Sequence, residues 1–145
     1  MPLIQNKKAY FNYEILEKIE AGIELLGFEV KSLKKGQGTL EGSHITIRGN
    51  EAFVINMQIP PYQPANTPKD YDPTRNRRLL VTKKEIERLL KEESTKGLTI
   101  VPLSVYNKGK KLKLEIAIVR GKKKFDKRET IKKRDTDREI RRELK

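Results

Sequence analysis

The last 26 residues of this 145-residue chain hold too few apolar side chains to take part in a hydrophobic core. Residues 120–145 include 13 basic and 6 acidic residues but only four apolar ones, Phe125, Ile131, Ile140 and Leu144. Burying so little apolar surface cannot offset the conformational entropy that is lost on ordering. We therefore predict one folded domain over residues 1–119 and a basic tail over residues 120–145 that is disordered in the free protein.

Residues 11–25 of the predicted domain form a long segment in which apolar and polar side chains alternate. Alternation is typical of a half-buried strand, and the β-branched and aromatic side chains of this segment favour the same structure. Ile15, Ile19 and Ile23 also fit one face of a helix. We interpret the segment as a strand.

Two hairpins are also predicted. Residues 44–48 and 51–57 flank Gly49-Asn50, a pair that suits a tight turn between antiparallel strands. Residues 99–106 and 111–119 form the second hairpin, and its second strand alternates cleanly between apolar and charged side chains.

Two helices are predicted from apolar side chains spaced three or four residues apart. The first begins near Leu26 and ends at Gly36, a residue type that commonly terminates helices. The second begins with a capping box at Thr82–Glu85 and ends at Gly97, and its expected buried stripe consists of Ile86, Leu89 and Leu90.

These elements predict a mostly β fold of the α+β class, with five or six antiparallel strands. A curled sheet or small barrel with two covering helices is the natural way to bury their apolar faces. Residues 58–78 hold five of the seven prolines and are expected to form a long irregular loop. A loop of this length is often functional.

The formal net charge of +13 points to a polyanionic partner, usually nucleic acid. The chain has no cysteine and a single histidine, His44, so thiol nucleophiles and clusters of Cys or His metal ligands are excluded. No glycine-rich phosphate loop or nucleophile motif is present. We expect a binding protein with no catalytic residues, no metal and no cofactor.

No apolar run reaches the ~20 residues of a membrane span, and the N-terminus lacks the apolar segment of a secretory signal. We therefore expect a cytoplasmic protein with no membrane partner. The tail also lacks the bulky apolar residues of a basic helix that lies on a membrane.

Basic clusters lie next to aromatic residues at four places, beginning at Lys7, Arg75, Lys108 and Lys122. This combination suits RNA, because lysine and arginine bind phosphates while aromatic rings contact unpaired bases. A general rRNA-binding or ribosome-assembly protein remains an alternative on these grounds.

Several short runs resemble, in their order, the small protein B family, the SsrA-binding or tmRNA-binding proteins of bacteria. They are EAGI from Glu20, GFEVKSL from Gly27, DPTRNRRLL from Asp72, PLSVY from Pro102 and GKKKFDKR from Gly121. The chain departs from the family pattern at His44, where many members have tyrosine, and in a tail that lacks tryptophan.

The resemblance implies an oligonucleotide-binding-type antiparallel barrel that acts as a monomer in a 1:1 complex with tmRNA. It implies binding to the tRNA-like domain of tmRNA, delivery of that RNA to stalled ribosomes and a part in trans-translation. The tail would become helical in the decoding region and the vacant mRNA channel of the small ribosomal subunit. The stalled ribosome would thereby be rescued, and its nascent chain tagged for degradation.

The resemblance also assigns residues to these roles. The family's RNA-contacting positions correspond here to Asn6, Lys7, Glu20, Arg75, Arg77, Arg78, Leu80 and Lys113. A carboxylate at Glu20 makes sense as an acceptor for base or ribose donors, and Leu80 would contact an unstacked base. The expected ribosome contacts of the tail are Gly121, Lys122, Lys123, Lys124, Asp126, Lys127, Arg128, Lys132, Lys133 and Arg134.

Overall fold

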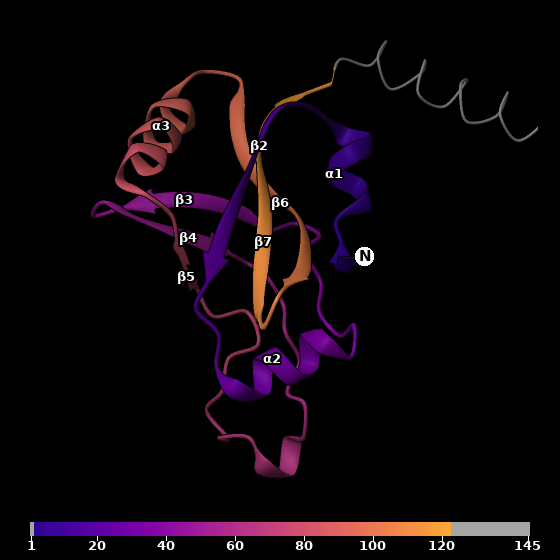
Figure 1. The fold of residues 1–145 in the computed structure, drawn as a ribbon. Helices are drawn as coiled ribbons and strands as arrows, with labels where there is room; N and C mark the ends of the chain where they lie inside the picture. Colours follow the sequence, from indigo (N-terminus) through magenta and orange to yellow (C-terminus); the bar gives the residue numbers. More distant parts are fainter. Residues whose placement is uncertain (1, 123–145) are drawn as a thin grey trace, which may run out of the picture.

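A computed structural model describes residues 2–122 of the chain. In this part of the chain a single antiparallel sheet has the strand order β1-β6-β7-β2-β5-β4-β3, and three α-helices lie around it (Figure 1). The elements are β1 (Pro2–Gln5), α1 (Lys7–Asn12), β2 (Tyr13–Ile23), α2 (Gly27–Lys34), β3 (His44–Arg48), β4 (Glu51–Ile55), the 3₁₀ turn η1 (Pro64–Asn66), β5 (Arg77–Leu80), α3 (Lys83–Ser94), β6 (Leu98–Lys108) and β7 (Lys111–Gly121). The predicted α+β class with a mostly antiparallel sheet is confirmed.

The long alternating segment forms β2, so its alternative interpretation as a helix was wrong. β2 pairs with β7 from Tyr13 opposite Gly121 to Gly22 opposite Lys113, with a bulge between Ile15 and Glu17. Nearly the whole strand is thus stabilised by backbone hydrogen bonds to a single partner, which outweighs the helical spacing of its isoleucines.

The predicted turn and cap residues occupy the positions expected for them. Gly49 and Asn50 connect β3 to β4 with φ angles of 56° and 63°, the positive values that a type I′ turn requires. At the start of α3, the Glu85 N–H donates to the Thr82 hydroxyl, and the Thr82 N–H donates to the Glu85 carboxylate.

The predictions of five or six strands and two covering helices were wrong, since β1, β5 and α1 were missed. β1 and β5 have only four residues each, and α1 has six. β1 is held by β6, and β5 lies between β2 and β4, so partners distant in the sequence stabilise them. Elements this short carry too little periodicity to be recognised locally.

The inner face of the sheet carries the main hydrophobic core. Ile19 and Ile23 of β2 pack there with Leu114 and Ile116 of β7, and Leu89 of α3 is also fully buried in this core. Leu90 was expected to join Leu89 but is 47% exposed, because α3 buries a narrower stripe than its apolar residues suggested.

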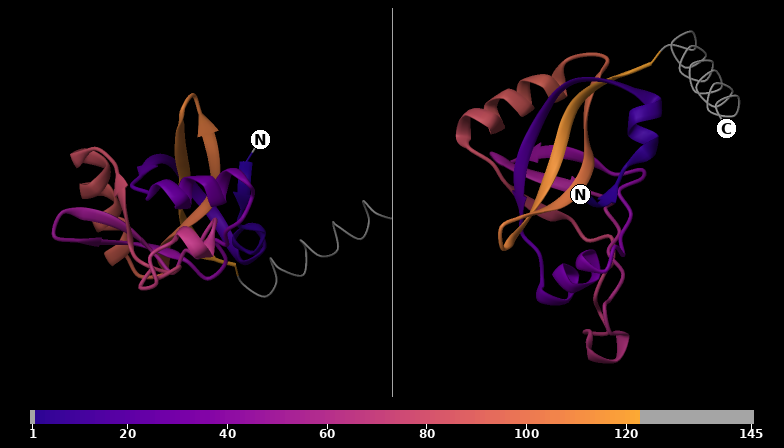
Figure 2. Two further views of the ribbon diagram at one scale, coloured as in Figure 1. Left: turned by 90° about the horizontal axis from the view of Figure 1, so that it is seen from below. Right: turned by 45° about the vertical axis from the view of Figure 1, so that its right-hand side comes forward.

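A smaller apolar cluster lies on the outer face of the sheet, beneath α1. It consists of Ala9, Val101, Leu103, Ala117 and Val119. The figures place α1 and α3 at opposite sides of the long strands and α2 beside the β6–β7 turn (Figures 1 and 2). The outer face is therefore covered near α1 and remains open toward the β6–β7 turn.

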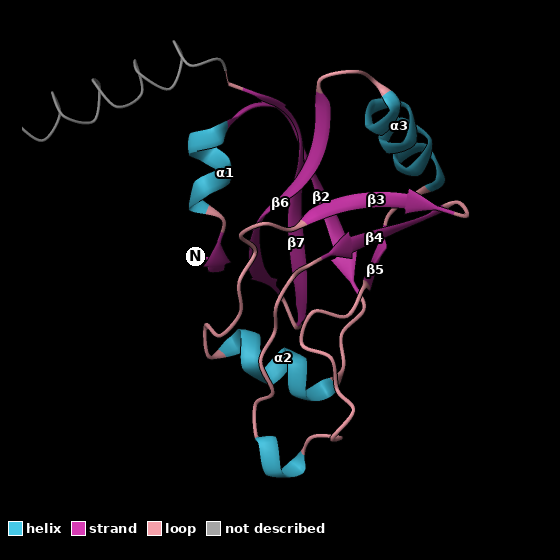
Figure 3. Ribbon diagram, turned by 180° about the vertical axis from the view of Figure 1, so that it is seen from behind, coloured by secondary structure: helices cyan, strands magenta, loops and turns pink. Residues whose placement is uncertain are grey.

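The proline-rich segment forms a loop that projects beyond α2 and contains η1 (Figure 3). The prediction of one irregular loop over residues 58–78 is only partly right, because β5 begins at Arg77. This early start joins the end of the loop directly to the sheet.

Candidate nucleic-acid interface

Four residues form a row across the open part of the outer face. Tyr106 of β6 is opposite Lys113 of β7, Lys113 is opposite Gly22 of β2, and Gly22 is opposite Leu80 of β5. Residues that are directly opposite in a sheet point to the same face, so these side chains share one surface. Two residues predicted to contact RNA, Leu80 and Lys113, are thus brought together although 33 positions separate them in the sequence.

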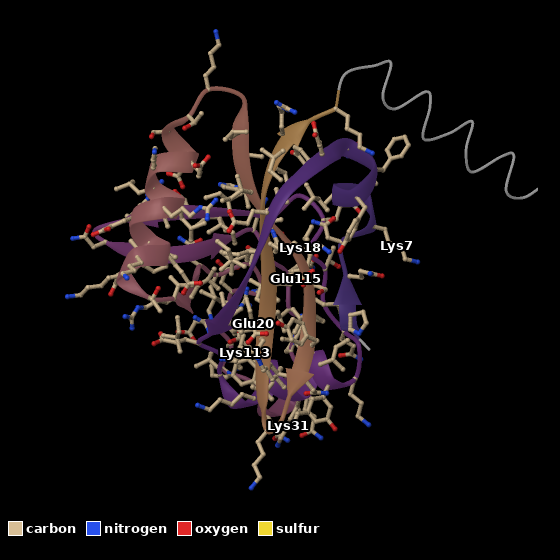
Figure 4. All side chains as sticks on the ribbon, turned by 45° about the horizontal axis from the view of Figure 1, so that its top comes forward. Lys7, Lys18, Glu20, Lys31, Lys113 and Glu115 are labelled. Atoms are coloured by element: carbon tan, nitrogen blue, oxygen red, sulfur yellow. The ribbon has the colours of Figure 1, made fainter. Side chains whose placement is uncertain are left out.

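Glu20 lies two residues before Gly22 and therefore on the same face (Figure 4). Its carboxylate accepts hydrogen bonds from the Tyr106 hydroxyl at 2.5 Å and from Lys108 Nζ at 2.9 Å. The Tyr106 hydrogen bond, followed by the contact with Lys108, lowers the pKa of Glu20 below its usual value. The side chain is consequently held as an oriented anion that can accept hydrogen bonds.

The row of polar residues continues from Glu20 toward α1. Glu115 is opposite Glu20, and its carboxylate is 3.8 Å from Lys18 Nζ (Figure 4). Lys18 Nζ also lies 5.7 Å from the centre of the Tyr10 ring, close enough for a cation–π contact. Cationic, anionic and aromatic groups therefore alternate along this face.

Arg77 is turned into the protein, away from the surface. Its side chain is fully buried, and Arg77 Nη2 and Nε donate to Glu29 Oε2 at 2.6 and 2.8 Å. Its guanidinium also donates to the carbonyl oxygens of Met57 and Pro73. The geometry therefore removes Arg77 from the residues that can reach an RNA in the folded protein.

Arg75 and Arg78 also differ from each other in how deeply their side chains are buried. Arg75 is partly buried and donates to both carboxylate oxygens of Glu29. Arg78 is exposed and pairs with the exposed Glu24 and Glu51 at 3.1 and 3.3 Å. Of the three arginines predicted to form a basic loop, Arg78 is the most exposed to solvent.

Asn6 and Lys7 are adjacent in sequence but occupy different environments. Asn6 is buried, where its side-chain oxygen accepts from the Ala9 N–H at the start of α1 and its amide donates to the Pro102 carbonyl oxygen at 2.9 Å. Lys7 is exposed on α1, and its side chain lies away from those of Glu20 and Lys113 (Figure 4). Asn6 thus stabilises the fold, while Lys7 is free to contact a ligand at the edge of the domain.

β7 extends beyond residue 119, where the predicted domain ends. β7 continues to Gly121, which is opposite Tyr13, and the Lys122 N–H donates to the Asn12 carbonyl oxygen. Gly121 and Lys122 therefore belong to the folded domain. The other tail residues predicted to contact the ribosome lie outside the described residues: Lys123, Lys124, Asp126, Lys127, Arg128, Lys132, Lys133 and Arg134.

Sequence reasoning missed Tyr106 and Lys108 as partners of Glu20, and Gly22 as the centre of the row. The two-residue period could have placed Glu20 and Gly22 on one face, but the register between strands is not visible in the sequence. Between residues 2 and 122, no group of three or more His, Cys, Asp or Glu residues could hold a metal ion. No helix in the same range is long and apolar enough to span a membrane.

Comparisons with known proteins identify one family. A family model described as SmpB protein matches residues 3–145. The SsrA-binding protein of Mesoplasma florum is 54% identical over 140 residues, covering 97% of this chain and 94% of the relative. The SsrA-binding protein of Malacoplasma penetrans is 48% identical over 143 residues, covering 99% and 97%.

A solved structure has a similar fold. It is described as "tmRNA-SmpB: a journey to the center of the bacterial ribosome", and the matched chain is 42% identical with a TM-score of 0.69. The match covers 83% of this chain and 84% of the other. The similarity therefore extends over most of the folded domain.

Proposed function

This chain belongs to the SmpB protein family, and on that premise we propose that it binds tmRNA and acts with it on the ribosome in trans-translation. It recognises the tRNA-like domain of tmRNA, forms a 1:1 complex and delivers the RNA to stalled ribosomes. It contributes binding and placement, while the ribosome carries out the chemistry. A protein that acts on bacterial ribosomes does so in the cytoplasm.

The row of Tyr106, Lys113, Gly22 and Leu80 is the observation that carries this proposal. It combines a lysine for phosphates with an exposed apolar side chain for a base, and Glu20 beside it can accept from base amino groups or ribose hydroxyls. We propose that Glu20, Leu80 and Lys113 form the centre of the RNA contact and that Lys7 and Arg78 flank it. Asn6, Arg75 and Arg77 support the domain from inside.

The curvature of the sheet supports the proposal of an oligonucleotide-binding-type barrel. β3 and β6 are not hydrogen-bonded neighbours in the sheet, yet they pack against each other, and α3 contacts both. A sheet that curls in this way presents a continuous outer surface to an RNA.

The basic tail has a separate proposed role. Its excess of basic over acidic residues suits the phosphates of rRNA, and its mixed signs allow pairing within a helix that forms on binding. We propose that the tail enters the decoding region and the vacant mRNA channel, where it allows the stalled ribosome to resume translation on tmRNA.

The test is a comparison of two RNAs at the same salt concentration. The protein should bind the tRNA-like domain of tmRNA much more tightly than an ordinary elongator tRNA. Lys113→Glu should weaken binding to that domain by roughly 1–3 kcal/mol, the scale of a charge-assisted hydrogen bond. Lys96→Glu is the matched control, because Lys96 is exposed beyond the opposite end of β6 and its reversal changes the net charge equally.

Equal affinity for the two RNAs would contradict the proposal and favour a general rRNA-binding protein. Equal losses in the Lys113 and Lys96 variants would show that net charge alone controls affinity. Purification of the protein from cells offers a second test, since a single small structured RNA, rather than fragments of rRNA, should accompany it.

A further inference from the structure

Directly after β7, Lys122 lies against the C-terminal end of α1 (Figures 1 and 2). Its backbone N–H donates to the Asn12 carbonyl oxygen at 3.0 Å, and its Nζ donates to the Tyr10 carbonyl oxygen at 3.3 Å. The carbonyl groups in the last turn of an α-helix have no following turn to provide a donor. Lys122 therefore supplies two donors at the end of α1 where the helix itself has none to offer.

α1 is a helix that needs such contacts, because it is short and its own charges are unfavourably placed. It has six residues, and its first turn carries Lys7 and Lys8 but no acidic residue, the reverse of what the helix dipole favours. Its last turn contains no basic residue. Lys122, 112 positions after Tyr10, brings a positive charge to that end. The end of α1 and the end of β7 therefore stabilise each other.

The two residues before Lys122 are held in the sheet. Gly121 is opposite Tyr13, and Arg120 is opposite Glu14, with Arg120 Nη2 2.7 Å from Glu14 Oε2. The chain thus reaches Lys122 with its direction already set by β2. The contacts of Lys122 with α1 extend this order by one residue beyond the sheet.

We propose that Lys122 is a positioning residue, which fixes the place and the direction in which residues 123–145 leave the domain. Its ammonium group closes the end of α1, and the backbone that follows starts from this closed position. The family resemblance implies that Lys122 contacts the ribosome, but its Nζ is directed to the protein's own backbone. This inference rests on the proposed function, because it takes the tail to enter the mRNA channel.

A fixed exit matters because the tail must reach one site while the domain is held by tmRNA. If the tail leaves the domain in many directions, only a fraction of the molecules point it toward the channel, and the apparent affinity of the tail decreases by that fraction. An exit that is already ordered in the folded domain also lowers the entropy that is lost on binding. Lys122 can therefore affect the ribosome step without touching rRNA.

The first measurement concerns the exit of the tail in the free, full-length protein. The chain has no cysteine, so Lys91→Cys on α3 and Phe125→Cys carry two spin labels at defined sites. The distribution of distances between the labels should be wider in Lys122→Met, which keeps an unbranched side chain but lacks the ammonium group. Lys122→Arg should restore the narrower distribution, because a guanidinium can donate to the same carbonyl oxygen. Lys8→Met is the matched control, since it removes one positive charge from the exposed side of α1.

The second measurement compares tmRNA binding with tagging on stalled ribosomes in the unlabelled variants. Lys122→Met should lower the tagging rate by on the order of tenfold, the scale of one charge-assisted hydrogen bond, and leave the affinity for the tRNA-like domain unchanged. Lys122→Arg should recover most of the rate, and Lys8→Met should match the wild type. Thermal unfolding of each variant verifies that the domain is folded.

Negative results would have different meanings. If Lys122→Met lowers tagging but leaves the distances in the free protein unchanged, the lysine contacts the ribosome directly and the inference is overturned. A wider distribution with an unchanged tagging rate would overturn it as well, because the direction of the exit would then have no role. If the wild type itself neither binds the tRNA-like domain specifically nor supports tagging, the proposed function fails, and the distance measurement still shows whether Lys122 holds the end of α1.

Discussion

The Arg77 guanidinium and the Glu29 carboxylate form an ion pair in which both side chains are fully buried, with Nη2 2.6 Å from Oε2. Glu29 also accepts from Arg75, from the Tyr71 hydroxyl and from the Leu26 N–H at the start of α2. One carboxylate thus connects α2, the end of the proline-rich loop and β5. Because Leu80 lies three residues after Arg77 in β5, this pair also fixes part of the proposed RNA surface.

Glu29→Gln should destabilise the domain by about 3–5 kcal/mol, because it leaves the guanidinium of Arg77 buried without a counter-charge. Urea denaturation measures the free energy of unfolding. Glu24→Gln is the control, since the Glu24–Arg78 pair is exposed and should contribute less than about 1 kcal/mol. A similar decrease in the free energy of unfolding of the two variants would mean that the buried Glu29 pair stabilises the domain no more than an exposed pair does.

The stability of the domain should decrease in acid partly through Glu29. Burial by itself raises the pKa of Glu29, but the hydrogen bonds from Arg75, Leu26 and Arg77 outweigh it and hold the pKa below its usual value. A carboxyl group with a lowered pKa contributes stability above its unfolded pKa of about 4.3, and this contribution is lost as the pH falls through the folded pKa.

Urea denaturation between neutral pH and about pH 3 tests this linkage. The free energy of unfolding of the wild type should decrease more steeply with acid than that of Glu29→Gln. Parallel curves for the two proteins would assign the acid sensitivity to other carboxylates.

Tyr106→Phe should change the pH dependence of RNA binding. The Tyr106 hydroxyl donates to Glu20 and lowers the pKa of that carboxyl group, while burial, followed by this hydrogen bond, raises the pKa of Tyr106 and keeps it a protonated donor. Without the hydroxyl, Glu20 should bind a proton at a higher pH. If the carboxylate accepts from RNA, affinity should therefore begin to fall at a higher pH than in the wild type.

Filter binding or fluorescence anisotropy across an acidic pH series measures this shift. Tyr62→Phe, in the proline-rich loop, removes a hydroxyl elsewhere and serves as the control. Identical pH midpoints for Tyr106→Phe and the wild type would show that Tyr106 does not act on RNA binding through Glu20.

Arg78→Ala should weaken RNA binding and reduce the salt dependence of the affinity, because Arg78 is the exposed member of its arginine group. Loss of one phosphate contact lowers the slope of log K against log salt by about one. Arg88→Ala is the control, since Arg88 has a similar exposure and also forms an ion pair, with Glu17 of β2, but lies on α3. An unchanged slope for Arg78→Ala would exclude a phosphate contact at this position.

Truncation after Lys122 should leave a stable domain that still binds tmRNA but no longer supports tagging on stalled ribosomes. Truncation after Val119 should in addition lower the unfolding temperature, because it removes Arg120 and Gly121 from their pairing with Glu14 and Tyr13. Thermal unfolding, RNA binding and a tagging assay on stalled ribosomes distinguish the two forms. Loss of RNA binding in the longer form would contradict the proposed division between domain and tail.

The parts of the fold that were predicted correctly depend on neighbours in the sequence. The alternation of Leu112, Leu114, Ile116 and Ile118 predicted β7, and the same logic predicted β2. β3, β4 and β6 were predicted as strands of two hairpins. The Thr82–Glu85 capping box and the Gly49-Asn50 turn are local for the same reason. β1 and β5 depend on pairing with strands far away in the sequence, so no local pattern revealed them.

In the candidate site, too, the local sequence predicted single residues, whereas their arrangement depends on contacts between distant segments. Family motifs pointed to Glu20, Leu80 and Lys113, but only the register of β2 with β5 and β7 brings these residues to one face and gives Gly22 its place between Leu80 and Lys113. Tyr106 and Lys108 contact Glu20 only because β6 pairs with β7 at the matching position. Register depends on the packing of whole strands, which is why motifs alone could not supply it.

The sequence by itself determined the charge, the turns, the helix cap and the scarcity of apolar residues after residue 119, since each is a property of composition or of near neighbours. Only the tertiary structure decided which of three close arginines would face the solvent. Arg77 is buried because Glu29, 48 positions away, provides a counter-charge inside the protein, whereas Arg78 points to the other face of the same strand. An arginine can be buried only where the fold places a carboxylate beside it inside the protein, and the sequence near the arginine does not show where that carboxylate will be.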